Sequence, residues 1–254
     1  MELPAVGLGT MGIETPEPIT TALDLGYRHL DTARIYGNEG VVGDALAASD
    51  VPREEVTVAT KLWVDALDAA DVAPAARESA DLLGVETIDL LYVHRPRGEY
   101  DPDTTLPELD RLVEEGIVDA VGVSNFEPDD LDRASDILET PIAAHQTELH
   151  PLYYRPELVR QARNGGYPLV AYSPLAGGQV GDVDAVVDVA DRHGTTPEAV
   201  AIAWATAKEP VVTIPKASSR KHLRANLAAA DLTLDSVDIA AIDAVERETE
   251  LFPE

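Results

Sequence analysis

Residues 56–94 read VTVATKLWVDALDAADVAPAARESADLLGVETIDLLYVH and hold two apolar segments on either side of a stretch of helical composition. The apolar segments, 56–62 and 88–94, are rich in Val, Leu, Ile and Ala and do not alternate strictly between apolar and polar residues, which is typical of strands buried on both faces of a parallel sheet. The stretch between them, 69–83, predicts a helix. This segment therefore predicts a strand–helix–strand unit with parallel strands.

The same unit recurs along the chain. Six further strand-like segments bring the total to eight, at residues 5–10, 29–33, 120–125, 143–148, 169–173 and 211–215. Helix-compatible stretches lie between them, for example at 18–25, 39–48, 106–115 and 128–138, and two additional helices are predicted at 183–193 and 236–245. Eight such units in 254 residues predict one (β/α)8 TIM-barrel domain over residues 1–254, with two extra helices.

A doubly wound open sheet is the alternative fold. Gly7, Gly9 and Gly12 have the Gly-x-Gly-x-x-Gly spacing of a dinucleotide-binding turn, and Asp31 follows at the distance of the acidic residue that such folds use. We prefer the barrel because the other chemically informative residues follow later strands.

The charge of the chain is strongly negative. It has 47 acidic against 19 basic residues, a net charge of −28, and is 45% hydrophobic, which is too apolar for a disordered chain. So acidic a surface repels nucleic acid and anionic membranes, and neither is expected as a partner. The composition resembles that of proteins from salt-accumulating organisms, and we expect a halophilic archaeal source.

Cysteine is absent, which excludes disulfides and thiolate chemistry. The sequence shows no secretory leader pattern and no apolar run near the roughly 20 residues that span a bilayer. These features predict a cytoplasmic protein.

Polar side chains follow nearly every predicted strand. In a TIM barrel the carboxyl ends of the strands meet at one mouth, where the active site lies. Titratable groups after the second, third and fourth strands indicate catalysis rather than chance. The residues at the strand ends are Thr10, Asp31, Lys61, His94, Ser124, Asn125, Gln146, Tyr172 and Lys216.

Six motifs resemble those of the aldo-keto reductase family and occur in the family's order along nearly the whole chain. They are GYRHLDTARIYGNE (26–39), VATKLW (58–63), LLYVHRP (90–96), GVSNF (122–126), AYSPL (171–175) and IPK (214–216).

The resemblance implies NAD(P)H-dependent reduction of aldehydes and ketones to alcohols by hydride transfer. Tyr36 is then the general acid, with Lys61 lowering its pKa, Asp31 pairing with Lys61, and His94 orienting the carbonyl. His94, Trp63, Arg95 and Phe126 are the expected substrate-binding residues. For Arg95 an alternative stays open, in which its side chain turns outward and pairs with acidic residues of the following loop.

The resemblance also implies a dinucleotide site with Tyr172 beneath the nicotinamide. The expected cofactor-binding residues are Thr10, Met11, Asp31, Ser124, Asn125, Gln146, Tyr172, Ser173, Leu175, Lys216, Ser218, His222 and Asn226. Residues 216–224 contain four basic residues and no acidic one. This composition favours an anion-binding patch over a basic helix that forms ion pairs with neighbouring acidic residues. NADP(H) is favoured over NAD(H), although His222 stands where the family usually has an arginine on the 2′-phosphate.

Two departures concern the ends of the barrel. Family members open with a β-hairpin that closes the bottom of the barrel, and this hairpin is expected to be largely absent here. The segment after Val245 is short, which predicts an open pocket with broad substrate tolerance.

Two other functions remain to be weighed. One is a nucleotide-binding regulatory barrel subunit with little turnover, and the other is a hydrolase or isomerase on the same fold. His145 and His150 flank the sixth predicted strand without matching ligands on neighbouring strands, so no metal site is expected. The expected partner is a small carbonyl substrate, and the expected state is a monomer or weak oligomer.

Overall fold

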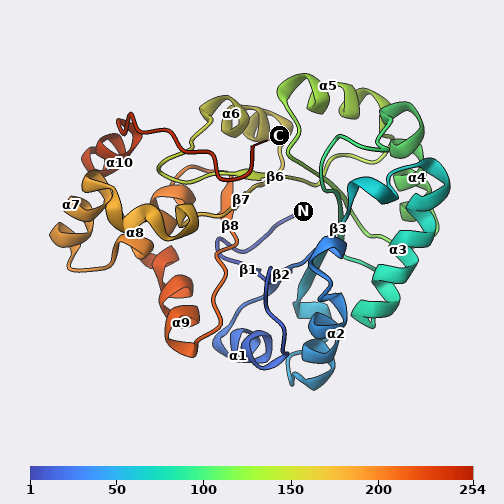
Figure 1. Cartoon of the computed structure of the whole chain (residues 1–254), viewed down its shortest axis with the longest axis horizontal. Helices are drawn as coiled ribbons and strands as arrows, with labels where there is room; N and C mark the ends of the chain where they lie inside the picture. The colour runs from blue at the N-terminus through green and yellow to red at the C-terminus, as the bar shows by residue number, and fades with distance from the viewer. Residues whose placement is uncertain (254) are drawn as a thin grey trace.

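A computed structural model of the chain describes residues 1–253 and shows eight parallel strands in one sheet, paired in sequence order (Figure 1). Their bounds are β1 Leu8–Gly9, β2 His29–Asp31, β3 Thr57–Leu62, β4 Leu90–Val93, β5 Val121–Ser124, β6 Ala144–Glu148, β7 Leu169–Tyr172 and β8 Val211–Thr213. All eight predicted strands are present, each shorter than or equal to its predicted range.

The sheet closes on itself next to β1. Val6 forms a parallel bridge with Thr213 of β8, and the Gly7 and Thr213 amides donate to Thr213 O and Ala5 O at 2.8 and 2.9 Å. These contacts make a (β/α)8 barrel, so the predicted fold is confirmed and the open doubly wound sheet is wrong. Within the described residues, no hairpin precedes β1.

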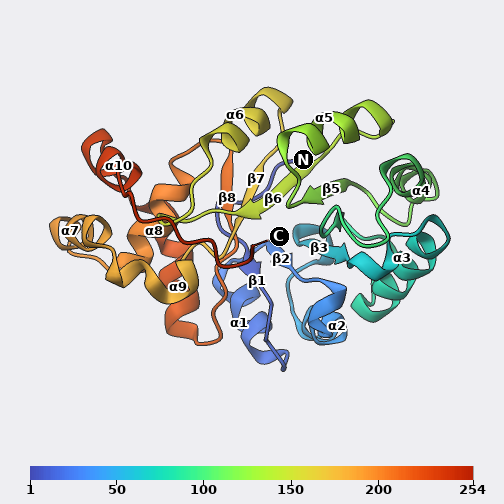
Figure 2. The same cartoon turned by 45° about the horizontal axis from the view of Figure 1, so that its top comes forward.

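Helices surround the barrel (Figures 1 and 2). The described residues form α1 Glu17–Leu25, α2 Glu39–Ala48, α3 Ala69–Leu83, α4 Pro102–Glu114, α5 Pro128–Ile137, α6 Pro156–Gly165, α7 Asp184–His193, α8 Pro197–Thr206, α9 Arg220–Ala228 and α10 Ser236–Asp243. The two extra helices correspond to α7 and α10. Among helices of residues 1–253, none has the length and apolar character that a bilayer crossing requires.

Local sequence explains where the helices start and stop. Helix α6 begins at Pro156, whose fixed φ suits the first turn, and ends before Gly166, which has φ 72°. Gly26, Gly84 and Gly194 end α1, α3 and α7 in the same left-handed conformation. These short signals set where α1, α3, α6 and α7 end.

Strand residues divide between two apolar clusters. One lies between the sheet and the helices and includes Val58, Leu91 and Val93. The alternate residues of β3 and β4, Ala59 among them, join residues of β6 to β8 in a smaller second cluster. Strands β3, β4, β7 and β8 contribute residues to both clusters and are therefore packed on both faces, which fixes the side chains that follow them at the mouth.

Candidate active site

A cavity of about 650 Å³ opens at the carboxyl ends of the strands. Most of the residues expected to bind substrate or cofactor line it: Thr10, Met11, Asp31, Tyr36, Trp63, His94, Arg95, Asn125, Gln146, Tyr172, Ser173, Leu175 and Lys216. The barrel thus brings together side chains from β1 to β8 and the loops after them.

Asp31 and Lys61 form a buried ion pair at the floor. The Lys61 Nζ donates to Asp31 Oδ1 at 2.5 Å and to Thr32 O at 2.7 Å, and neither charged side chain is more than 2% exposed. The second Asp31 oxygen accepts from Gln146 Nε2 at 2.7 Å. Burial lowers the pKa of Lys61, but Asp31 and Tyr36 raise it by more, so its pKa lies above the ordinary value and the ammonium stays charged.

Tyr36 lies over this pair, in the 3-10 turn Arg34–Tyr36 that follows β2. The Lys61 Nζ is 5.2 Å from the centroid of its ring. Burial raises the pKa of Tyr36, while Lys61 lowers it through its charge and a hydrogen bond. The pKa of Tyr36 is therefore above its ordinary value. The sequence led us to expect a lowered pKa, which is wrong because the effect of burial is larger than that of the Lys61 ammonium. Tyr36 is a neutral phenol, and hence a proton donor, at neutral pH.

His94 follows β4 and packs edge-on against two aromatic rings. Its ring centroid lies 6.0 Å from that of Tyr36 and 4.9 Å from that of Trp63. Burial, followed by the charges of Lys61, Arg95 and Arg97, lowers its pKa to about 2. The imidazole is therefore neutral, so it can donate a hydrogen bond to a carbonyl oxygen without itself carrying a charge.

Asn125 and Tyr172 form the opposite wall. The Tyr172 Oη donates to Asn125 Oδ1 at 2.9 Å, and Asn125 Nδ2 donates to His94 O and to Ser124 Oγ, each at 3.0 Å. Asn125 has φ 60°, a left-handed conformation that asparagine tolerates better than most residues. The Asn125 amide thereby fixes the Tyr172 ring at the cavity. Ser124 is fully buried beneath it and does not line the cavity.

Backbone turns form the rim beyond Tyr172. Ser173, Ala176, Gly177 and Gly178 all have positive φ, so the chain folds tightly there. Across the rim, Lys216 is exposed. A Cβ on Gly9 would lie 2.6 Å from Ile214 O, so only glycine allows β1 and the segment after β8 to approach so closely.

Four expected site residues lie away from this cavity. Phe126 is 1% exposed and packs edge-on against Tyr100 at 5.6 Å, so it belongs to the core and not to the cavity wall. Ser218 and His222 are exposed near the start of α9, and Asn226 is buried in that helix. Within residues 1–253, no cluster of three His, Cys, Asp or Glu side chains is suited to hold a metal ion.

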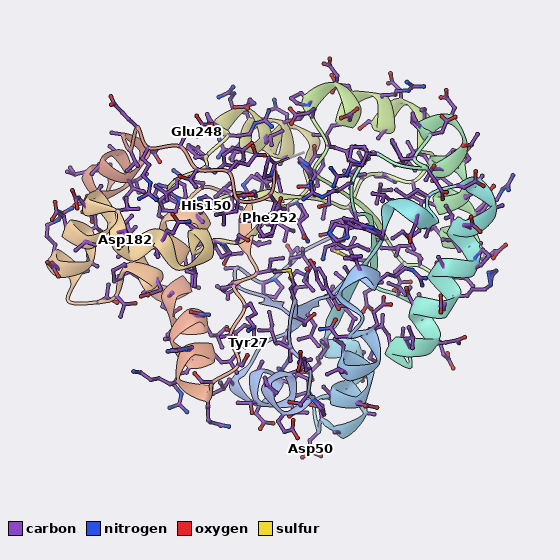
Figure 3. The ribbon with its side chains drawn as sticks, viewed as in Figure 1. Tyr27, Asp50, His150, Asp182, Glu248 and Phe252 are labelled. Carbon is purple, nitrogen blue, oxygen red and sulfur yellow. The ribbon has the colours of Figure 1, made fainter. Side chains whose placement is uncertain are left out.

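The chain after α10 forms a cavity wall that the sequence did not indicate. This tail runs from α10 across the mouth of the barrel (Figures 1 and 2), and Phe252, labelled near the centre of Figure 3, lines the cavity. Its ring lies 5.8 Å from that of Tyr172. The short tail therefore supplies part of the cavity wall, and broad substrate tolerance stays a prediction.

Buried polar groups anchor the tail. The carboxylate of Glu148, at the end of β6, accepts from the Leu251 and Phe252 amides at 2.7 and 3.1 Å and contacts His150 Nε2 at 2.8 Å. The Leu251 side chain packs against Gly177, where an added Cβ would lie 3.4 Å from Leu251 Cδ1. The tail thus connects β6 to the rim. Ile35 and Ile214 also line the cavity and were not expected, because apolar residues carry no functional signal in sequence.

Comparison with known proteins identifies the family. The Aldo/keto reductase family model matches residues 5–247, so the chain belongs to this family of carbonyl oxidoreductases, which use nicotinamide cofactors. Methylglyoxal reductase DkgB of Escherichia coli O157:H7 is 35% identical over 97% of this chain and 96% of its own length. The 9,11-endoperoxide prostaglandin H2 reductase of Trypanosoma cruzi is 35% identical over 96% of this chain and 88% of its own.

Solved structures agree with this assignment. A putative 2,5-diketo-D-gluconic acid reductase B superposes with a TM-score of 0.94 at 31% identity, covering 99% of this chain and 92% of the other. MGS-M4, an aldo-keto reductase from a Medee basin deep-sea metagenome library, gives 0.93 at 33% identity, covering 100% and 95%. These relatives are named as reductases, which supports carbonyl reduction and gives no support to the regulatory-subunit alternative.

Proposed function

We propose that this barrel reduces small aldehydes and ketones to alcohols with NADPH, and that Tyr36 is the proton donor. The observation that carries the proposal is the stack of groups at the cavity floor, in which Tyr36 and His94 lie over the buried Lys61–Asp31 pair. This arrangement provides a neutral phenol, a fixed positive charge beneath it and a neutral imidazole beside it. Those are the groups that a developing alkoxide requires.

The chain's own residues then perform the proton chemistry. His94 and Tyr36 hydrogen-bond the carbonyl oxygen, and Tyr36 transfers its proton to that oxygen as the alcohol forms. Lys61 stabilises the phenolate left behind. Asp31 keeps the Lys61 ammonium oriented and charged, although burial by itself would favour the neutral amine. When bound, the reduced nicotinamide supplies the hydride that reaches the carbonyl carbon.

The residues present fit a dinucleotide. Tyr172, held by Asn125, offers a flat ring on which a nicotinamide can stack. Gln146 donates through its Nε2 to Asp31 Oδ2, so its side-chain carbonyl oxygen can accept from the carboxamide of the nicotinamide. Asn125 and Ser124 are hydrogen-bonded to each other, so in this proposal they orient Tyr172, a different role from the expected direct contact with the carboxamide.

In this proposal the phosphates of the dinucleotide lie at the rim of the cavity and at the start of α9. Exposed Lys216, Arg220, Lys221 and Arg224 give a local positive charge in a chain of net charge −28. The amino end of α9, capped by Ser219, adds backbone N–H groups that favour phosphate. This charge supports NADPH over NADH, with Ser218, His222 and Asn226 at the adenosine end.

The acidic surface suits concentrated salt, and we extend the proposal to a cytoplasmic, single-domain enzyme of a halophilic archaeon that acts as a monomer or weak oligomer. Cations at molar concentration shorten the range of repulsion among the carboxylates to about 3 Å.

The test is the oxidation of NADPH and NADH by the purified chain in molar KCl, with methylglyoxal and a panel of neutral aldehydes. We expect NADPH to be consumed in proportion to alcohol formed, faster than NADH. A folded chain that binds NADPH but consumes none with any of the carbonyl compounds would overturn the proposal.

A further inference from the structure

Asn38 is a buried polar residue next to the proton donor, and the proposed mechanism does not use it. It lies two residues after Tyr36, at the amino end of α2, and is 5% exposed. Its Nδ2 donates to Thr10 O at 2.8 Å and to Ile13 O at 3.0 Å, and its Oδ1 accepts from Thr32 Oγ1 at 2.8 Å. This one amide group therefore joins the loop after β1 to the loop after β2.

These bonds replace the usual role of an asparagine at this position. An asparagine at the N-cap of a helix commonly accepts a hydrogen bond from the first turn, whose amides have no partner within the helix. Among the described residues of α2, none donates to the Asn38 side chain. Both donors and the acceptor of the amide are used on other loops, which indicates that the amide serves the position of those loops.

The turn that carries Tyr36 is held at its two ends. It starts at Arg34, whose guanidinium is hydrogen-bonded to α3. Ile35 and Gly37, on either side of Tyr36, are exposed, and Gly37 has φ 65°. The chain returns to the buried interior at Asn38. The Asn38 amide therefore fixes the end of the turn that lies closest to Tyr36 in the chain.

The same contacts lead to the cation beneath the phenol. Thr32 donates to Asn38 through its hydroxyl, and its backbone oxygen accepts from Lys61 Nζ at 2.7 Å. The Lys61 Nζ in turn lies 5.2 Å from the centroid of the Tyr36 ring. Asn38 therefore contacts both segments whose separation sets the effect of the Lys61 charge on the Tyr36 hydroxyl, an effect that falls with distance.

We propose that Asn38 is a positioning residue that holds the Tyr36 hydroxyl above Lys61 and within reach of the substrate carbonyl. Asn38 lies outside the described lining of the cavity, so it acts through Tyr36 and touches neither substrate nor cofactor. Thr10, on the cofactor side, keeps two other bonds, from its amide and its hydroxyl to Asp31 O at 2.9 and 3.0 Å. Removal of the Asn38 amide therefore slows proton transfer and leaves the cofactor site formed.

This inference rests on the proposed function, and a double-mutant cycle in molar KCl tests it. Asn38→Ala is expected to lower kcat for aldehyde reduction by roughly 10- to 100-fold, as misplacement of a reacting group does, and to keep the Kd for NADPH within about threefold. In the Tyr36→Phe background the same change should alter the residual kcat by less than about threefold, because no phenol is left to position.

A loss of equal size in both backgrounds would overturn the inference, and so would an Asn38→Ala enzyme whose kcat stays within about threefold of wild type. Thr32→Val keeps the test open if Asn38→Ala does not fold. It removes one of the three hydrogen bonds with little change of shape, and we expect kcat to fall by roughly 3- to 10-fold, again only where Tyr36 is present.

Asp110→Ala is the matched control for the loss of a buried side chain with several hydrogen bonds. Asp110 lies on α4, is 9% exposed, and accepts from the Glu139 and Thr140 amides at 3.0 and 2.9 Å. We expect this variant to lower the urea midpoint, as Asn38→Ala does, and to keep the wild-type kcat. A kcat that falls equally in the two variants would assign the loss to stability and overturn the inference.

Hydrogen exchange gives a readout that needs no turnover. The Tyr36 and Gly37 amides donate to Ala33 O and Arg34 O, each at 3.0 Å. Both should exchange at least about tenfold faster in Asn38→Ala, and at the wild-type rate in the control variant. Faster exchange in a chain that reduces no carbonyl compound would reject the proposed function and still support Asn38 as the residue that holds this turn. Unchanged exchange would overturn the inference.

Discussion

Among single residues, the active site depends on a buried charge that is fully partnered. Lys61 is completely buried, and its ammonium is stabilised by Asp31 and by Thr32 O. Such a pair gains little net stability over apolar side chains, but losing one partner leaves the other charge buried and uncompensated. The pair is therefore best explained by the positive charge that it holds beneath Tyr36.

Lys61 and Asp31 are therefore expected to be strongly coupled in their effect on the free energy of unfolding. Lys61→Met should lower the free energy of unfolding by about 3–5 kcal/mol, because Asp31 then lacks its cation. The double variant Lys61→Met/Asp31→Asn should recover much of that loss, since the asparagine oxygen still accepts from Gln146 and carries no charge. Urea unfolding at fixed high salt measures both, and simple additivity of the two single losses would contradict the account.

At the scale of elements, the register of the barrel requires close contacts between backbones. Helices α2 and α3 approach at Gly43, where a Cβ would lie 2.6 Å from Leu82 O and 2.9 Å from Leu83 O. These atoms are backbone and cannot move aside without shifting α3. The two helices follow β2 and β3, which position Asp31 and Lys61, so this contact also supports the site.

We expect Gly43→Ala to destabilise the fold by about 1–3 kcal/mol, as overpacking does. Gly40→Ala is the control in the same helix, because nothing lies within 4 Å of its Cβ position. That change should be neutral or stabilising by up to about 1 kcal/mol, since alanine is the better helix former. Equal effects of the two changes on the urea midpoint would show that the contact at Gly43 is unimportant.

The elements and most of the site could be predicted from sequence for a physical reason. Strands buried on both faces need continuous apolar runs, and the polar residues that follow them must meet at one mouth. The tail could not be predicted, because Phe126 and Phe252 look alike in sequence and only the folded path shows which one reaches the cavity. The net pKa of Tyr36 and the direction of Arg95 depend on burial, which is a property of the packed molecule.

At the scale of the whole molecule, the net charge of −28 sets the conditions under which the fold is stable. Some surface carboxylates are paired, as where Arg155 binds Glu127 and Glu157, but acidic residues far outnumber basic ones. The melting temperature should therefore rise between about 0.1 M and 1 M KCl, as the screening length falls from about 10 to 3 Å. A melting temperature unchanged over that range would contradict the high-salt account.

Acid should destabilise the molecule through buried histidines. Burial lowers the pKa of His29 to about 4 and that of His145 to about 3, and among the described residues neither ring has a hydrogen-bond partner. Below about pH 6.5 the unfolded chain takes up these protons and the folded chain does not, so stability present above pH 6.5 is lost as the pH falls.

His145→Leu isolates one of these protons. The slope of the unfolding free energy against pH, measured near pH 5, should be smaller than in the wild type by about 1.4 kcal/mol per pH unit. The slope is the readout because the substitution can also change stability at every pH. An identical slope in the two proteins would mean that His145 binds its proton in the folded state.

In the proposed reaction, Tyr36 transfers its proton to the carbonyl oxygen above the Lys61–Asp31 pair. Its most direct test compares wild type and Tyr36→Phe in molar KCl, with kcat for aldehyde reduction measured beside the Kd for NADPH. We predict a kcat lower by roughly 10²- to 10⁴-fold, because the proton transfer is lost, and a Kd that changes little. A Tyr36→Phe enzyme that keeps kcat within a few-fold of wild type would contradict the account.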